Sequence, residues 1–324
     1  MKNIDDITEI EELIKYGDDL LHRAETNKLT KEEIEFFVND PDEIYPAKGE
    51  EITPDIEVKK EIYSMKDFEI IEDVAIFCED VVKWLKDYMI ANQLLSCVVG
   101  VSGGVDSAVV ERLCEKTGLK VICVAMPMYL HGDSDVNTLD LAMKLCAGRD
   151  VEFHIREIGP IIEIYKKASI GVIRLAEGNL RSRIRANILY DFAGNNFGFV
   201  VGTGNLDEDT IGYMTKGGDG LVDICPISMF HKSEVRKMAR LLEVPEEIIN
   251  AVPTAGLWDG QTDEQELGMT YDEVEWAIEY NGLDHCTNRQ QQVMEKVNKM
   301  RVKNQHKLAY PPVYKTFNRQ SGKQ

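Results

Sequence analysis

A glycine-rich turn that follows a short apolar segment constrains this chain more than any other feature. The segment Ser96–Val101 suits a strand buried on both faces, and it runs directly into residues Ser102–Ser107, which read Ser-Gly-Gly-Val-Asp-Ser. Because glycine has no Cβ, the backbone of such a turn can approach a ligand closely. Its N–H groups and the N-terminus of the next helix form an anion site. The turn therefore predicts a phosphate-binding loop at the carboxyl end of a strand.

Strands and helices alternate along the chain around this turn. The apolar spacing predicts helices over residues 67–91, 105–116, 136–147 and 178–193, and strands over 96–101, 120–125, 151–156 and 199–202. This alternation is typical of βα units, so we expect an α/β fold with a doubly wound, Rossmann-like parallel sheet and helices on both faces. Ligands should lie at the carboxyl ends of the strands.

The first 66 residues differ in composition from the rest of the chain. Residues 1–68 hold 20 acidic and 9 basic side chains, a net charge of 9 − 20 = −11 out of −20 for all 324 residues. Helical spacing near Ile10–Leu21 and a capping box at Thr30 predict two short helices, and three prolines within residues 40–60 predict a loop. We therefore expect a small, helical, acidic N-terminal extension over residues 1–66 and a catalytic domain over 67–324.

Charge and cysteine usage exclude several classes of function. A net charge of −20 opposes binding to nucleic acid and to anionic membrane surfaces. The seven cysteines form no CxxC pairs, and most lie in apolar stretches, as do Cys97, Cys123 and Cys225. This pattern predicts reduced, buried thiols without a catalytic role. With no apolar leader at the N-terminus and no membrane-spanning run, we expect a soluble cytoplasmic protein.

The glycine turn is neither of the common nucleotide loops. It lacks the Gly-Lys-Ser/Thr of kinases and the GxGxxG of dinucleotide folds. Asp106 places a carboxylate beside the anion, which is electrostatically reasonable only with a divalent cation between them. The full motif resembles the pyrophosphate loop of the N-type ATP pyrophosphatases, which cleave ATP to AMP and pyrophosphate while they adenylate a substrate oxygen.

Further motifs indicate which family of these ATP pyrophosphatases the chain resembles. In chain order they are the arginine-rich segment Gly178–Arg185, Gly202–Asn205 with Glu208, Gly212–Gly220, Asp223–Ile227 with Lys232, Pro253–Trp258, Gln261–Gly268, and His306-Lys307. In this order and spacing the set resembles the NAD synthetase family over about residues 67–316. The glycine turn alone would not separate that family from GMP synthetases or tRNA-modifying relatives.

The resemblance implies a role for individual residues. ATP would be bound by Gly100, Ser102, Gly103, Gly104, Val105, Asp106, Ser107, Thr203, Lys232 and Thr254. Mg²⁺ would be held by Asp106 and Glu208, and deamido-NAD by Arg183, Lys216, Asp223, His306 and Lys307. Asp106, Lys216 and Lys232 would be the catalytic residues. Gly217 departs from the aromatic residue of many bacterial members, which puts one packing contact in doubt.

The implied enzyme is an ammonia-dependent NAD synthetase that works as a homodimer with ATP as co-substrate and Mg²⁺ as cofactor. The nicotinate carboxylate of deamido-NAD would be adenylated with release of pyrophosphate, and ammonia would then displace AMP. Residues 253–269 would form a mobile lid that excludes water. The first 66 residues are too few for the glutaminase domain of the long members, so glutamine would require a separate glutaminase subunit.

Three alternatives stay open at this stage. The chain could be another adenylating amidotransferase that acts on a nucleobase or a different carboxylate. It could also be a nucleotide sensor without turnover, although Asp106, Glu208, Lys216 and Lys232 are all retained. The third alternative is a tRNA-modifying relative, which the acidic charge and the lack of a long basic stripe disfavour.

Overall fold

The described part of the protein lies within one compact unit. The computed structural model describes residues 74–128, 136–168, 173–254, 262–280, 282 and 286–313. All of these fall within the unit Glu57–Gln324, and the chain's other unit is Met1–Ile56. The two short helices and the loop expected before residue 66 lie outside the described residues, so the extension stays a prediction.

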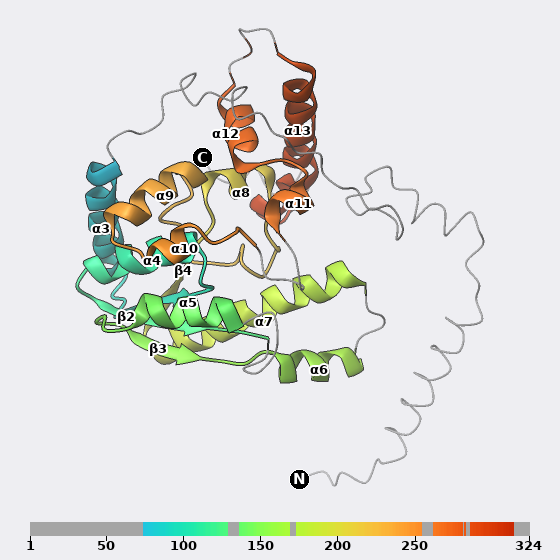
Figure 1. Ribbon diagram of the computed structural model, residues 1–324. Coiled ribbons are helices and arrows are strands. Elements are labelled where there is room, and N and C mark those ends of the chain that lie inside the picture. Colours follow the sequence, from blue (N-terminus) through green and yellow to red (C-terminus); the bar gives the residue numbers. More distant parts are fainter. Residues whose placement is uncertain are drawn as a thin grey trace, which may run out of the picture. The chain divides into compact units, whose positions relative to one another are not determined.

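A four-stranded parallel sheet forms the centre of the described unit (Figure 1). Its strands are β1 (Ser96–Gly100), β2 (Lys120–Ala125), β3 (Glu152–Ile155) and β4 (Gly198–Val201), in the spatial order β3-β2-β1-β4. Val98 in β1 lies opposite Ile122 on one side and Val200 on the other. The chain first builds outward from β1 through β2 and β3, then returns to the other side of β1. Such a reversal is the switch point at which doubly wound sheets bind ligands.

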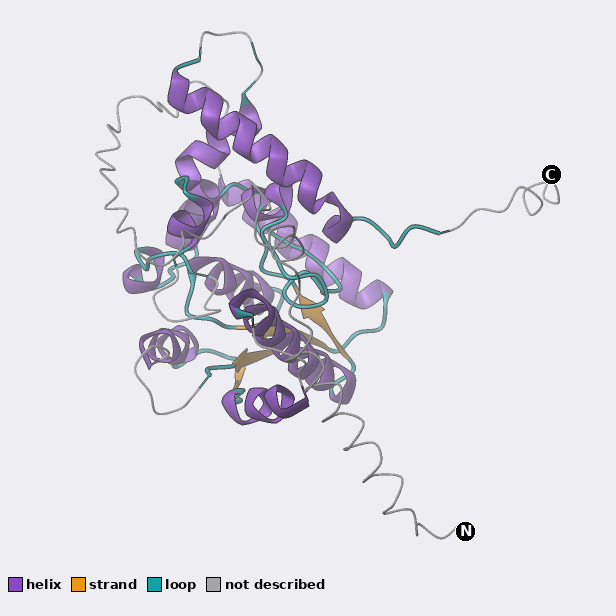
Figure 2. Cartoon of the chain, turned by 90° about the vertical axis from the view of Figure 1, so that its right-hand side faces the viewer, coloured by secondary structure: helices purple, strands orange, loops and turns teal. Residues whose placement is uncertain are grey.

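Helices cover both faces of this sheet, as the continuous burial of β1 on both of its faces requires. Cys97 and Val99 join the core cluster that includes side chains of α3 (Val74–Ala91), α4 (Val105–Lys116), α5 (Val136–Cys146) and α9 (Lys232–Leu241). Val98 points to the opposite face and packs beneath α7 (Arg174–Asn195). Figure 2 shows helices on both sides of the strands. The predicted doubly wound α/β fold is confirmed.

A second, smaller core joins elements that lie beyond the sheet. Four helices contribute its apolar side chains: α8 (Leu206–Ile211), α11 (Asp263–Leu267), α12 (Tyr271–Glu279) and α13 (Asn288–Leu308). The buried members are Ile211, Leu267, Met269, Val274, Val293 and Val297. The short helix α10 (Glu246–Ile249) packs instead with α4 and α9. The small core holds α8 and α12 beside the carboxyl end of the sheet.

Up to residue 202 the predicted elements agree with the structure with one omission, and no prediction was made for helices α8 to α13. Helix α4 and strand β2 have the predicted bounds, and the other strands end within one residue of them. Helix α7 begins at Arg174, four residues earlier than expected, and the predicted start at residue 67 lies outside the described residues. Helix α6 (Gly159–Ala168) was missed. Its Pro160 resembles a breaker, but a helix tolerates proline in its first turn because the first N–H groups need no partner there.

One expectation about the cysteines is wrong. All seven are free thiols, and Cys97 and Cys123 are buried as predicted, but Cys225 is exposed. Its neighbour Ile224 pairs with Val201 at the edge of the sheet and is buried. Because successive side chains of an extended segment point in opposite directions, Cys225 faces outward. Within the described ranges, no helix is both long and apolar enough to cross a membrane.

The packing of α3 against the sheet layer can be tested at Leu85, whose side chain is fully buried. Leu85→Ala should lower the free energy of unfolding by about 2–5 kcal/mol, because it removes buried methyl groups and leaves a cavity. The exposed neighbour Lys86→Ala should change it by less than about 0.5 kcal/mol. Urea unfolding followed by circular dichroism measures both, and equal effects would contradict this packing.

Candidate active site

The glycine turn leaves β1 and enters α4 with a geometry that only glycine supports at its second position. Gly103 has φ +81°, and a Cβ there would stand 2.4 Å from the carbonyl oxygen of Thr138. Gly104 then caps α4 in an extended conformation without a side-chain hydrogen bond. The first N–H groups of the helix are therefore available to an anion. Val105 contributes only backbone, because its side chain is buried in the main core.

The two serines of the turn mainly brace it. The Ser107 hydroxyl donates to the carbonyl oxygen of Gly104 at 3.0 Å and accepts from the backbone N–H of Ser102 at 3.2 Å. The Ser102 hydroxyl lies 3.2 Å from that of Ser107 and accepts from the N–H of Gly104 at 3.3 Å. These contacts hold the turn in its shape before any ligand arrives. The two hydroxyls thus hold the loop in shape, and they are also expected to contact the phosphates.

A buried lysine joins the two carboxylates that were predicted to hold a metal. Lys232 Nζ lies 2.6 Å from Asp106 Oδ2 and 3.2 Å from Glu208 Oε1, and only 3% of its side chain is exposed. Burial raises the pKa of Glu208 to about 7, although the charge of Lys232 opposes that rise. Burial also acts to lower the pKa of Lys232, but Asp106 and Glu208 outweigh it and raise that pKa. The protonated lysine therefore balances only one of two carboxylates, which leaves a site that attracts further positive charge.

Two side chains that the sequence did not assign complete this centre. The amide of Asn205 donates to Asp106 Oδ1 at 3.1 Å, and its oxygen accepts from the backbone N–H of Glu208 at 3.0 Å. The Tyr271 hydroxyl lies 3.0 Å from Glu208 Oε1, and Lys232 Nζ lies 4.6 Å from the centre of the same ring. An Asn followed three residues later by Glu is a capping box, so the sequence held a signal for Asn205.

One cavity of about 410 Å³ lies against this centre at the carboxyl end of the sheet. All ten residues expected to bind ATP line it: Gly100, Ser102, Gly103, Gly104, Val105, Asp106, Ser107, Thr203, Lys232 and Thr254. Glu208 and Lys307 line it as well. The volume suits a single mononucleotide-sized ligand. Sequence positions from 100 to 307 therefore converge on one space.

Four of the five residues expected to bind deamido-NAD lie together, and of these four only Lys307 lines the cavity. Arg183 Nε donates to the carbonyl oxygen of Lys216 at 3.2 Å, and Lys216 Nζ donates to that of His306 at 2.8 Å. Lys307 Nζ donates to the carbonyl oxygens of Gly212 and Met214, which joins this group to the cavity. The group presents four basic side chains beside the cavity.

Asp223 stands apart from the other four residues. It accepts a hydrogen bond from the Tyr190 hydroxyl at 3.1 Å and another from the backbone N–H of Val200 at 2.8 Å. Both partners lie in α7 and β4, and Asp223 does not line the cavity. The structure therefore brings Arg183, Lys216, His306 and Lys307 together and leaves Asp223 at the sheet.

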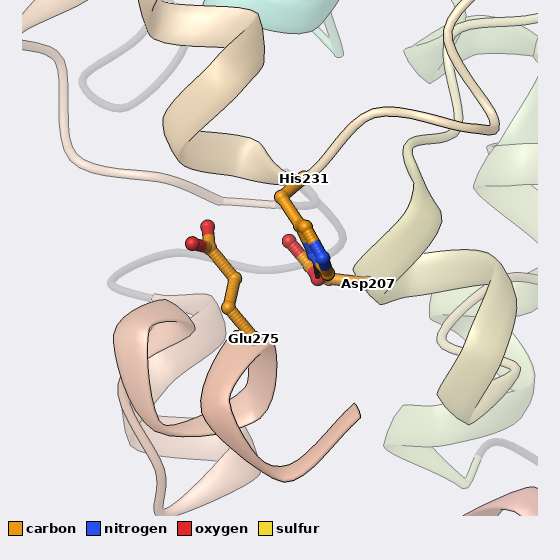
Figure 3. Close-up of side chains that lie close together, drawn as sticks. All are labelled: Asp207, His231 and Glu275. Atoms are coloured by element: carbon orange, nitrogen blue, oxygen red, sulfur yellow. Dashed lines mark hydrogen bonds and ion pairs between the residues drawn. The ribbon is translucent and has the colours of Figure 1, made fainter. Parts of the chain in front are cut away.

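A histidine–carboxylate cluster lies directly behind the lysine. Asp207, His231 and Glu275 are buried and close enough for a metal ion, and Figure 3 shows the ring of His231 directed at Asp207 with Glu275 approaching from α12. His231 Nδ1 lies 2.6 Å from Asp207 Oδ1, and Nε2 lies 3.0 Å from Glu279 Oε1. Because both ring nitrogens face carboxylate oxygens, an imidazolium satisfies the cluster without a metal.

The protonation of His231 makes a testable contribution to stability. Burial acts to lower the pKa of its ring, but the hydrogen bond and charge of Asp207, with Glu275 and Glu279, raise that pKa from 6.5 to about 9. Since the folded value exceeds the unfolded one, the stabilisation is fully present below about pH 6.5 and disappears as the pH rises through 9. This stabilisation should amount to roughly 3 kcal/mol.

Urea unfolding of the wild type and of His231→Gln at pH 6, 7.5 and 9.5 measures this contribution. The wild type should lose stability across that range, and the variant should lose distinctly less. His154→Gln, which removes a partly exposed ring beside Glu152 on β3, is the control and should unfold like the wild type. An identical pH dependence in the wild type and His231→Gln would show that His231 is not the group responsible.

Comparison with known proteins places this site in a family. Residues 77–311, more than half of the chain, match the NAD synthase family. The NH(3)-dependent NAD(+) synthetase of Methanococcoides burtonii is 43% identical over 188 residues, which span 56% of this chain and 70% of that protein. The enzyme of the same name from Pyrococcus furiosus is 34% identical over 72% of this chain and 93% of its own length.

A solved structure agrees with these matches. The NMN synthetase of Francisella tularensis superimposes with a TM-score of 0.68 at 31% identity, over 76% of this chain and all of that one. The family match covers the glycine turn, the carboxylate–lysine centre and the basic group beside the cavity. The chain belongs to the NAD synthase family, whose members are ATP-dependent ligases.

Proposed function

We propose that this protein is an ammonia-dependent NAD synthetase that adenylates the nicotinate carboxylate of deamido-NAD. The observation that carries the proposal is the convergence of Asp106, Glu208 and Lys232 on one cavity beside the open N-terminus of α4. That arrangement suits the phosphates of a nucleotide, since it combines backbone N–H donors with a buried cation. The curated relatives that the chain matches are named for the same reaction.

The reaction has two steps that need no protein nucleophile. A carboxylate oxygen of deamido-NAD bonds to the α-phosphorus of ATP while the bond from that phosphorus to the pyrophosphate oxygen breaks. Ammonia then bonds to the activated carbonyl carbon, AMP leaves with the former carboxylate oxygen, and the nitrogen loses a proton. Positioning and charge stabilisation carry both steps. Lys232 is proposed to face the phosphates, because its ammonium is held at the cavity between two carboxylates.

The donor set fits Mg²⁺. Asp106 and Glu208 supply carboxylate oxygens, the ligand type that this hard cation prefers, and Lys232 leaves one of their two charges unbalanced. These two residues would hold the ion, which supplies positive charge to the developing pyrophosphate. Asn205 and Tyr271 orient the two carboxylates from outside. The protein itself therefore contributes two carboxylates that are already oriented before the ion binds.

The second substrate is proposed to lie across the basic group beside the cavity. A cavity of about 410 Å³, lined by the residues expected to bind ATP, suits the ATP nucleotide. Arg183 and Lys216, which stand outside its lining, can contact the phosphates of deamido-NAD. Lys307 is fixed between the two regions by the carbonyl oxygens of Gly212 and Met214.

The lid expected over residues 253–269 stays a prediction and does not include residues 263–269, because α11 spans Asp263–Leu267 and both Leu267 and Met269 are buried in the small core. Pro253 and Asp263 are joined, because the backbone N–H of Asp263 donates to the carbonyl oxygen of Pro253 at 3.1 Å. Residues 255–261 lie outside the described part of the chain. Asp263 also accepts from the Tyr271 hydroxyl at 3.0 Å, which connects the segment to Glu208. A lid placed there would shield the adenylate from water.

Ammonia is the proposed nitrogen donor in the cytoplasm, and a separate glutaminase is the partner that glutamine would require. A second candidate substrate is nicotinate mononucleotide, because a solved structure at TM-score 0.68 is an NMN synthetase. Both candidates present the same nicotinate carboxylate to the same centre. They differ in the adenylate half that only the dinucleotide carries, so the two substrates should be assayed side by side.

Purified protein with ATP, Mg²⁺, ammonium and deamido-NAD should form NAD, AMP and pyrophosphate. Asp106→Asn should retain the fold and lose at least about 100-fold in kcat, because it removes one of two carboxylates that hold the metal. The exposed Asp140→Asn on α5 is the matched control and should behave like the wild type. Formation of ADP and phosphate, absence of NAD, or faster turnover of nicotinate mononucleotide would each contradict the proposal.

The protein is also proposed to form a homodimer through α6 and the start of α7. Four large apolar side chains are exposed there: Ile164 at 68%, Tyr165 at 47%, Ile173 at 74% and Leu175 at 48%. The two helices pack together, so the four residues belong to one region of the surface. The same helix α7 carries Arg183, which would place the dinucleotide near the subunit interface.

Sedimentation velocity at micromolar concentration tests the dimer. The wild type should sediment as a dimer, and Ile164→Asp combined with Ile173→Asp should sediment as a monomer, because charges would enter an apolar interface. Val302→Asp, at an equally exposed apolar position on α13, should leave the dimer intact. A monomeric wild type, or dimers of all three proteins, would refute this interface.

A further inference from the structure

Two buried side chains stand one residue away from the groups proposed to bind metal and phosphate. Asp207 precedes Glu208 in the first turn of α8, and His231 precedes Lys232 at the start of α9. Asp207 is fully buried and His231 is 6% exposed. Neither residue lines the cavity, so any effect on the reaction passes through Glu208 and Lys232.

Asp207 connects the starts of these two helices with both of its oxygens. Oδ1 lies 2.6 Å from His231 Nδ1, and Oδ2 accepts from the backbone N–H of Lys232 at 2.8 Å. The same carboxylate thus bonds to the side chain of one residue and to the backbone of the next. It fixes the Cα from which the side chain of Lys232 departs, relative to the helix that carries Glu208.

Helix α12 closes the arrangement from the third side. Glu275 accepts from the backbone N–H of Ser233 at 2.8 Å, and Glu279 lies 3.0 Å from His231 Nε2. Within α9, Glu234 accepts from the backbone N–H of His231 at 2.8 Å. Three consecutive N–H groups at the start of α9 therefore each meet a carboxylate, and negative charge is favourable at a helix N-terminus.

We propose that Asp207 and His231 are positioning residues that set the placement of the Lys232 ammonium between Asp106 and Glu208. This inference rests on the proposed function, which gives that ammonium its role. A lysine has a flexible four-carbon stem, so a site that depends on its Nζ must anchor it independently of the substrate. Asp207 supplies the anchor at the backbone of Lys232 through one oxygen, and His231 holds its other oxygen.

The side chain of Lys232 shows how little freedom the arrangement leaves. It is almost wholly buried, its ammonium contacts both carboxylates, and it lies over the ring of Tyr271 at 4.6 Å. A shift of the α9 start relative to α8 would move Nζ away from Asp106 and Glu208 together. Misplacement by about 1 Å is enough to cost a large factor in rate, since catalysis here depends on position.

Steady-state kinetics with the full chain separates positioning from stability. Asp207→Asn keeps an oxygen for the N–H of Lys232 but loses the charge that holds His231, and His231→Gln keeps one donor for Asp207. Each should lower kcat at least 10-fold per folded protein, while KM for deamido-NAD changes less than twofold. In Asp207→Asn combined with His231→Gln, two amides can pair again, so kcat should fall no further than in the worse single variant.

The histidine–carboxylate pair His154 and Glu152 on β3 provides the matched control, with a contact of 2.6 Å and neither residue in the lining of the cavity. His154→Gln and Glu152→Gln should each keep kcat within twofold of wild type. Thermal unfolding of every variant fixes the assay temperature at which all are folded, and if Asp207→Asn does not fold, His231→Gln decides.

Wild-type kcat in folded His231→Gln and Asp207→Asn would overturn the inference, and so would losses that simply multiply in the double variant. If the wild type makes no NAD, the proposed function fails instead, and the two failures are distinct.

Discussion

The ion pairs from Lys232 to Asp106 and Glu208 are the contacts on which the site depends. They join residues 106, 208 and 232, which belong to three different helices. Burying one ammonium with two carboxylates is costly unless each group is held and hydrogen-bonded. Asn205 and Tyr271 supply those further bonds to the carboxylates. The pKa of Glu208 still rises to about 7, because these contacts do not fully offset the cost of burying its charge.

The fold makes this arrangement possible through the order of its strands. Because β1 lies between β2 and β4, the turn after β1 and the turn after β4 open at the same edge of the sheet. The first turn carries Asp106, and the second carries Asn205 and Glu208. The small core around Val274 and Val293 then holds α12 against α8, which brings Tyr271 to Glu208. The sheet and the small core thus each bring further side chains to the ion pairs of Lys232.

Much of this could be predicted from local sequence. The glycine turn, the βα alternation and the residues expected to bind ATP all have short-range signals, and the structure places those ATP residues around one cavity. Other parts had weak or misleading signals. Helix α6 was not predicted, because Pro160 resembles a helix breaker. Cys225 lies in an apolar stretch yet is exposed, because its strand-like segment lies at a sheet edge. The resemblance assigned Asp223 to deamido-NAD, and no local signal showed that it bonds to Tyr190 and to the backbone of β4.

The sequence by itself determined that the loop can bind phosphate beside a cation. Gly103 permits the tight turn and Asp106 supplies a carboxylate, and both can be recognised from residue type and spacing. Only the tertiary structure decided which charged side chains form ion pairs with one another. Lys232 lies 126 residues from Asp106, and Asp207 lies 24 residues from His231, so no local pattern links them. Electrostatic coupling depends on distance in space and on exclusion of water. Both quantities exist only after the helices have packed, which is why the positioning pair behind Lys232 became visible in the fold alone.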